Sequence, residues 1–124
     1  MEDKDYVDKD IAYKLYNLGI KIPSNSFYGD RLYTLETIVK EEELSEGDIL
    51  RPTLYDVQKW LRENNNIFVL VEPYFGEDYN CFISVSIYKL KSNYLEDVTD
   101  INIPNFEHYE EALNEGIKEA LKLI

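Results

Sequence analysis

The apolar residues of the C-terminal half change from a helical spacing to a strand spacing and back, and this order limits the possible folds more than any other feature. Thr53 is placed to cap a helix over 54–64, and an apolar stripe along that segment supports the same helix. The stripe consists of Leu54, Val57, Trp60 and Leu61. A final helix is expected over 108–123, where apolar residues again recur every three or four positions.

Between these helices the sequence predicts a β-hairpin and a weaker third strand. The segment 67–74 alternates apolar and other residues, and 76–80 holds the residue types of a turn. A second alternating strand follows from Cys81, which we expect to be a small core residue, and the third strand is expected over 93–98. The apolar positions of the hairpin are Ile67, Val69, Val71, Ile83, Val85 and Ile87.

The N-terminal part has weaker patterns. A helix is expected over about 9–18, with Asp8 or Asp10 as its N-cap and Gly19 as a left-handed C-cap. Residues 20–26 are expected to be rich in turns, and 31–39 fits a strand better than a helix, although both spacings are present. The acidic run over 41–48 is expected to be a solvated loop, with a docking site as the alternative.

The fold class that follows is α+β. We expect a single acidic domain over 1–124, with an N-terminal helix and connector over 1–50 and the helix, strand, strand, strand, helix cassette over 53–124. Its small antiparallel sheet should have three to four strands, with two helices packed on one face and the N-terminal helix extra. Gly116 lies on the apolar side of the last helix, which predicts a close approach to the sheet. The expected core is Leu15, Leu18, Leu54, Val57, Trp60, Leu61, Val69, Val71, Ile83, Val85, Ile87, Leu113, Ile117 and Leu121.

Charge narrows the possible partners. The chain has a formal net charge of −12, and between Glu63 and Glu115 it holds eleven acidic residues and two basic ones. Binding to nucleic acid or to an anionic membrane depends on Lys and Arg, so neither partner is expected, whereas a basic protein surface would be attracted. Residues 1–5 lack the positive start of a secretory signal, and no apolar run reaches the length of a membrane span, so we expect a cytoplasmic protein.

Two short motifs resemble a known group of proteins. The string from Pro52 to Leu54 with Lys59 to Glu63, and the later string from Tyr109 to Leu113 with Gly116 and Ile117, are similar to those of small uncharacterised proteins encoded by phages and prophages of gut bacteria. The resemblance covers most of the chain. It implies a virus-borne accessory gene acting in the cytoplasm of a bacterial host, and it implies no reaction or site residues.

The residues predict no enzyme, metal site or cofactor. His108 is the only histidine and stands at a helix start, and Cys81 is the only cysteine, so neither a nucleophilic pair nor a tetrahedral zinc set is expected. The spacing of Asp97, Asp100 and Asn102 is not that of a calcium loop. Paired carboxylates could serve as acid and base, but nothing selects a pair.

The order of the cassette also resembles that of double-stranded RNA-binding domains. Those domains contact phosphates with lysines near their second helix, whereas the last helix here starts with Glu107, Glu110 and Glu111. Topology alone does not transfer a function, so RNA binding is not expected.

Three possible functions remain open. The first is a non-enzymatic protein that binds a basic host protein through an acidic, tyrosine-rich surface, as an inhibitor or nucleic-acid mimic. The second is an oligomeric binder of a small molecule such as a nucleotide signal, and the third is a structural or assembly accessory protein of the virion. The candidate partner-binding residues for the first function are Glu77, Asp78, Tyr79, Glu96, Asp97, Asp100, Glu110 and Glu111.

Overall fold

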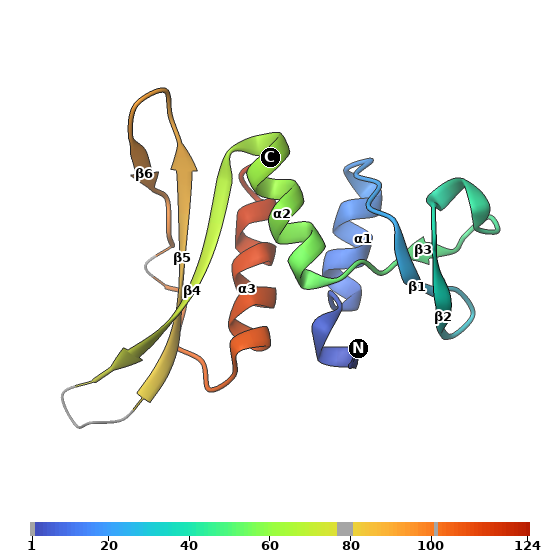
Figure 1. Cartoon of the computed structure of the whole chain (residues 1–124), viewed down its shortest axis with the longest axis horizontal. Coiled ribbons are helices and arrows are strands. Elements are labelled where there is room, and N and C mark those ends of the chain that lie inside the picture. Colours follow the sequence, from blue (N-terminus) through green and yellow to red (C-terminus); the bar gives the residue numbers. More distant parts are fainter. Residues whose placement is uncertain (1, 77–80, 101) are drawn as a thin grey trace. The chain divides into compact units, whose positions relative to one another are not determined.

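The computed structural model describes residues 2–76, 81–100 and 102–124, and its elements are labelled in Figure 1. The chain divides into two compact units, Met1–Val57 and Gln58–Ile124. The boundary falls inside helix α2 (Leu54–Asn65), which begins in the first unit and ends in the second. Each unit holds one three-stranded antiparallel sheet, so the α+β class is confirmed.

The first unit has the sheet order β2-β1-β3. Strand β1 (Ser24–Tyr28) is central and pairs antiparallel with β2 (Leu32–Val39) and with the two-residue β3 (Ile49–Leu50). The strand expected over 31–39 is therefore confirmed as β2. The expectation of turns over 20–26 is wrong for Ser24 to Ser26, because buried serine hydroxyls replace apolar side chains as the inward-facing groups of β1.

Local sequence signals account for the helix of this unit. The Asp8 carboxylate accepts a hydrogen bond from the Ile11 amide over 2.9 Å and caps α1 (Lys9–Asn17). Gly19 ends the helix with a φ of 73°, which confirms the predicted left-handed cap. Two short 3₁₀ turns, η1 (Asp3–Asp5) and η2 (Glu41–Glu43), lie before α1 and after β2.

The second unit has the order β4-β5-β6 and one helix, α3 (Tyr109–Leu121). Strands β4 (Ile67–Phe75) and β5 (Cys81–Leu90) form the long hairpin of Figure 1, and the short β6 (Leu95–Asp97) pairs with the end of β5. Asn66 alone connects α2 to β4 and has a φ of 55°. The predicted strands, and the helices over 54–64 and 108–123, are therefore confirmed within a few residues.

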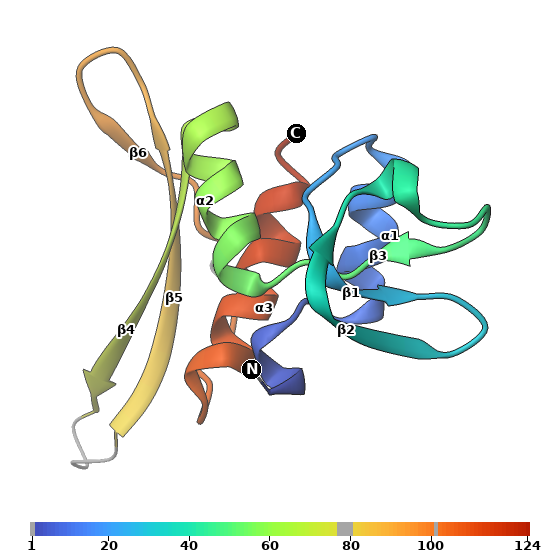
Figure 2. The ribbon, with the colours of Figure 1, turned by 45° about the vertical axis from the view of Figure 1, so that its right-hand side comes forward.

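Helix α3 lies against one face of this sheet, as both ribbon views show (Figures 1 and 2). A Cβ atom added at Gly116 would lie 2.5 Å from Val85 Cγ2 and 2.7 Å from Val69 Cγ1. Such distances are too short for real contacts, so the helix reaches its depth only because residue 116 has no side chain. The predicted close approach at Gly116 is confirmed, whereas the packing of two helices on one face stays a prediction.

Most of the predicted core is buried, and five positions differ. Leu18 is exposed, because α1 ends at Asn17 and the following residues leave the helical stripe. Cys81 is also exposed, since it pairs with Phe75 in the last pair of the β4–β5 ladder, next to the connection between the two strands. Trp60, Val71 and Ile83 are only partly buried. Within the described residues, no helix is long and apolar enough to cross a membrane.

A candidate acidic groove beside the last helix

The second unit has an acidic groove between α3 and the segment that leads to it. We define the acidic groove by its lining residues, and its volume is about 280 Å³. Glu111, Glu115 and Glu119 recur every four residues and so form one row along α3. The other lining residues are Asp100, Asn102, Ile103, Pro104 and Phe106.

The segment opposite α3 is held in place by the edge of the sheet. Phe106 exchanges two main-chain hydrogen bonds of 2.8 Å with Ile83 of β5, and its side chain is buried. Asp100 starts a turn in which its carboxylate accepts from the Asn102 amide over 2.9 Å and its carbonyl accepts from Ile103 over 3.1 Å. These contacts give the acidic groove one wall that is attached to the sheet at Phe106 and a second wall that is a helix.

The charge of the acidic groove is partly balanced at its rim. Glu115 Oε1 lies 3.4 Å from Lys118 Nζ, and Glu119 Oε1 lies 2.8 Å from Lys122 Nζ. The Glu119 hydrogen bond, followed by the charge of Glu119, raises the pKa of Lys122. Among the described residues, the lining has four carboxylates and no basic side chain, so its field attracts cations.

The sequence-predicted site residues separate in the structure. Asp100 and Glu111 both line the acidic groove, and Glu110 is the neighbour of Glu111 on α3. Glu96 and Asp97 lie instead on β6, where they pair with Lys89 and Tyr88 of β5. Glu77, Asp78 and Tyr79 lie outside the described residues.

Asp97 has a local structural contact of its own. Hydrogen bonds from the side chain of Thr99 and then from its backbone lower the pKa of the Asp97 carboxyl. The backbone bond runs from Thr99 N to Asp97 Oδ1 over 2.9 Å. The Thr99 hydroxyl in turn accepts a 2.8 Å hydrogen bond from the Ile87 amide, so this turn is fastened to β5.

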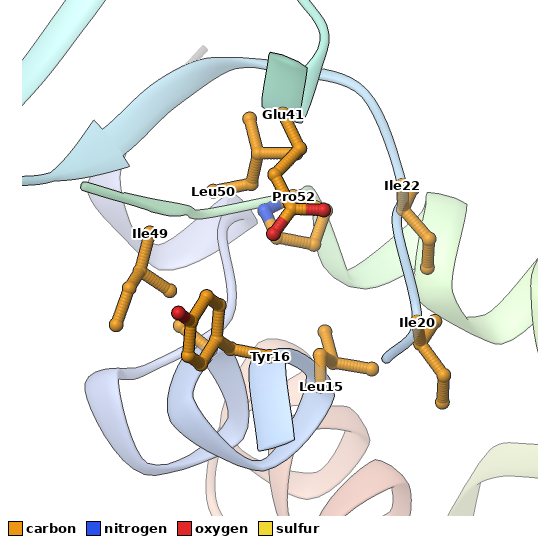
Figure 3. A pocket seen from close by; sticks show the side chains of 9 residues that line it. Leu15, Tyr16, Ile20, Ile22, Glu41, Ile49, Leu50 and Pro52 are labelled. Atoms are coloured by element: carbon orange, nitrogen blue, oxygen red, sulfur yellow. The ribbon is translucent and has the colours of Figure 1, made fainter. Parts of the chain in front are cut away.

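A small apolar cavity lies in the first unit, with Glu41 pointing into it (Figure 3). Its volume is about 10 Å³, which is about the size of one water molecule and far below that of a pocket for an organic ligand. One carboxylate oxygen of Glu41 is buried and has no hydrogen-bond partner, although Lys21 Nζ lies 3.5 Å away as an ion pair. The cavity is a packing feature and offers no space for a substrate.

A second concavity of the first unit has a volume of about 580 Å³. The rings of Phe27 and Tyr33, which line it, stack with centroids 4.9 Å apart. Its carboxylates would repel a phosphate group, so its aromatic surface does not favour a nucleotide. The acidic lining residues are Asp30, Glu46 and Asp48.

The first unit contains a buried arginine, Arg51, which the sequence patterns did not predict. Arg51 is only 4% exposed, and its guanidinium carbon lies 4.5 Å from the centroid of the Tyr6 ring and 5.9 Å from that of Tyr28. Its hydrogen-bonding neighbours include the buried Ser26 and the exposed Asp3. Burial, against the opposing charge of Arg51, raises the pKa of Tyr28. Arg51 lies between Leu50 and Pro52 and belongs to no repeating apolar or charged pattern. Its burial could therefore not be predicted from the sequence.

No cluster of three or more His, Cys, Asp or Glu side chains suited to a metal ion occurs in the part of the chain that the structure describes. No protein-family model, curated protein or solved structure matches the chain.

Proposed function

We propose that this protein is a non-enzymatic binder of a basic protein partner, and that the acidic groove receives lysine or arginine side chains of that partner. The observation that carries the proposal is the joint lining of one concavity by Asp100 and by the carboxylate row of α3. Cationic side chains would gain charge-assisted hydrogen bonds there, and their methylene stems would contact Ile103, Pro104 and Phe106.

Long-range attraction supports the same class of partner. A net charge of −12 raises the encounter rate with a basic surface and lowers it with nucleic acid, and this effect weakens with added salt. The resemblance to phage-encoded proteins suggests a partner in the cytoplasm of a bacterial host, with inhibition by occupation of a nucleic-acid groove as the consequence. A nucleotide binder is less well supported, because the concavity beside Phe27 and Tyr33 in the first unit is lined by three carboxylates.

A pair of charge-matched variants tests the proposal. Asp100→Lys with Glu111→Lys reverses two exposed carboxylates of the acidic groove, and Glu42→Lys with Glu43→Lys makes the same charge change at exposed positions of the first unit. Each tagged chain is incubated with host lysate at low and at high salt. Retained proteins and released small molecules are then identified by mass spectrometry, and circular dichroism confirms that both variants fold.

We expect a basic host protein to be retained at low salt by the natural chain and by the Glu42 and Glu43 variant, and to be lost from the groove variant. Equal loss from both variants would mean capture by net charge alone. Equal retention by both would exclude the acidic groove as the site. A released nucleotide without a protein partner, or no retained molecule, would overturn the proposed partner class in favour of a nucleotide binder or a virion accessory protein.

A further inference from the structure

We propose that the guanidinium group of Arg51 is a binding site for an oxyanion, a carboxylate or phosphate group, and that Asp3 occupies this site within the chain as a displaceable stand-in. One hydrogen-bond donor of this guanidinium group has no acceptor. Arg51 is almost completely buried, and its Nε is a buried nitrogen without a hydrogen-bond partner. A buried N–H without an acceptor is unfavourable, so the hydrogen-bonding capacity of Arg51 is not fully used as the chain stands.

Asp3 contacts only one nitrogen of the Arg51 guanidinium group, Nη2. Arg51 Nη2 donates to the Asp3 carbonyl oxygen over 2.8 Å and to Asp3 Oδ1 over 3.1 Å. Nη1 lies 3.5 Å from the Ser26 hydroxyl, at the limit of a hydrogen bond. Nε and Nη2 point their N–H groups along the same edge of the planar group, and a carboxylate or phosphate can accept from both at once. A bidentate oxyanion would therefore satisfy the nitrogen that Asp3 leaves unpaired.

The segment that carries Asp3 can move away from Arg51. We call residues 2–5 the N-terminal strap; it contains the 3₁₀ turn η1, and none of the residues of that turn is buried. The Asp3 side chain is 82% exposed, so removing it from Arg51 uncovers little apolar surface. Tyr6 and Val7, by contrast, are buried anchors, with the Tyr6 hydroxyl donating to Asn25 Oδ1 over 2.7 Å and the Val7 amide donating to the Pro52 carbonyl over 3.0 Å. The strap can open while the Tyr6 ring stays over the guanidinium group.

The surroundings of Arg51 favour a short-range contact despite the negative charge of the chain. The Tyr6 and Tyr28 rings contact the cation, and both Ser24 and Ser26 beside it are buried. Electrostatic interactions are stronger in such a water-poor setting than at the surface. The site is independent of the acidic groove, because all of these residues belong to the first unit.

The test follows the Arg51 Nε–H signal by NMR while sodium acetate, sodium phosphate or sodium chloride is added at equal ionic strength. We expect a saturable shift with acetate, phosphate or both, and none with chloride. The amides of Asp5 and Tyr6, which donate to Glu2 and Asp3 carbonyl groups of the closed strap, should exchange with solvent faster as the anion binds. Saturation by acetate identifies carboxylate as a ligand, and saturation by phosphate alone identifies a phosphate group.

Variants separate the site from general charge effects. Asp3→Asn weakens the stand-in, so the anion should bind about tenfold more tightly, because a larger fraction of chains has an open strap. Glu43→Gln changes the charge equally at an exposed position of the first unit outside the strap and should bind like the natural chain. Arg51→Lys should abolish the effect, and if it does not fold, the comparison of Asp3→Asn with Glu43→Gln still decides. Identical shifts with chloride, or equal binding by Asp3→Asn and Glu43→Gln, would overturn the proposal.

Discussion

The Gln58 side chain donates a hydrogen bond from Nε2 to the main-chain carbonyl oxygen of Val69 over 2.7 Å, and this contact lies on the outer edge of β4. The Leu90 amide donates to the Asn66 carbonyl, so these two residues form a hydrogen-bonded pair of the ladder between β4 and β5. Hydrogen-bonded and non-hydrogen-bonded pairs alternate along an antiparallel ladder, and the backbone N–H and C=O groups of Val69 and Val71 therefore point away from β5. Strand β4 is the end strand of its sheet. Gln58 and Pro73, which has no N–H group, therefore reduce the hydrogen-bonding capacity of this edge.

Replacing Gln58 by glutamate should destabilise the chain and promote its association. Glutamate has nearly the same shape but cannot donate at neutral pH, so the Val69 carbonyl would lose its partner at a cost of about 1 kcal/mol. Urea unfolding and light scattering measure the two effects. Lys59→Ala, a change at an exposed neighbouring position, serves as the control and should alter neither quantity. Unchanged stability in Gln58→Glu would show that the edge does not depend on this hydrogen bond.

Gly116→Ala should lower the free energy of unfolding by up to about 2 kcal/mol. Overpacking costs about 1 to 3 kcal/mol, and the better helix propensity of alanine offsets about 1 kcal/mol of it. The clash is with the branched side chains of Val85 and Val69, which have little freedom. In a Val85→Ala background, the same substitution should cost less, because only the Val69 clash remains. Denaturant unfolding of the four chains gives the coupling, and equal costs in both backgrounds would refute the steric explanation.

The ionised form of Asp97 should stabilise the folded chain only at sufficiently high pH. Its pKa is lowered in the folded state, so the contribution is present above the unfolded value of about 3.9 and is lost as the pH falls through the lower, folded value. The stability difference between the natural chain and Asp97→Asn should therefore shrink between pH 6 and acid conditions below about pH 4. Chemical unfolding at both pH values measures it. A difference that does not change with pH would contradict the assigned hydrogen bonds.

Thr53→Ala should cost about 1 kcal/mol of stability, because the Thr53 hydroxyl accepts from the Asp56 amide at the start of α2 over 3.1 Å. Thr53→Ser keeps that acceptor and should lose much less. Thermal or urea unfolding of the two variants decides the matter. Comparable losses would indicate that the threonine methyl group, rather than the cap, carries the effect.

Sequence patterns predicted the helices and the hairpin well because each rests on a local rule. The cap at Asp8, the left-handed Gly19 and the close approach at Gly116 all have physical causes that a single sequence reveals. Strand β1 was missed because its inward-facing groups are the hydroxyls of Ser24 and Ser26, which donate to the main-chain carbonyl oxygens of Arg51 and Tyr33 on the two neighbouring segments. No periodic pattern encodes such partners.

The candidate sites were less predictable than the fold. Asp100 and Glu111 were named from charge alone, and their meeting in one groove depends on Phe106 joining the edge of β5. Glu115 and Glu119 belong to the same groove and could have been found from their spacing of four with Glu111. The Arg51 site depends on contacts across 48 residues of chain, which neither composition nor spacing conveys.

The single residue Asn66 between α2 and β4 makes the length of this junction critical. Alternate side chains of a strand face opposite sides, so one inserted or deleted residue that carried β4 along would turn Ile67 and Val69 toward solvent and Phe68 toward α3. Length changes among natural variants of this chain should therefore gather in exposed segments such as 42–47 and be absent here. A library of one-residue insertions, scored for folded protein, would map this intolerance directly.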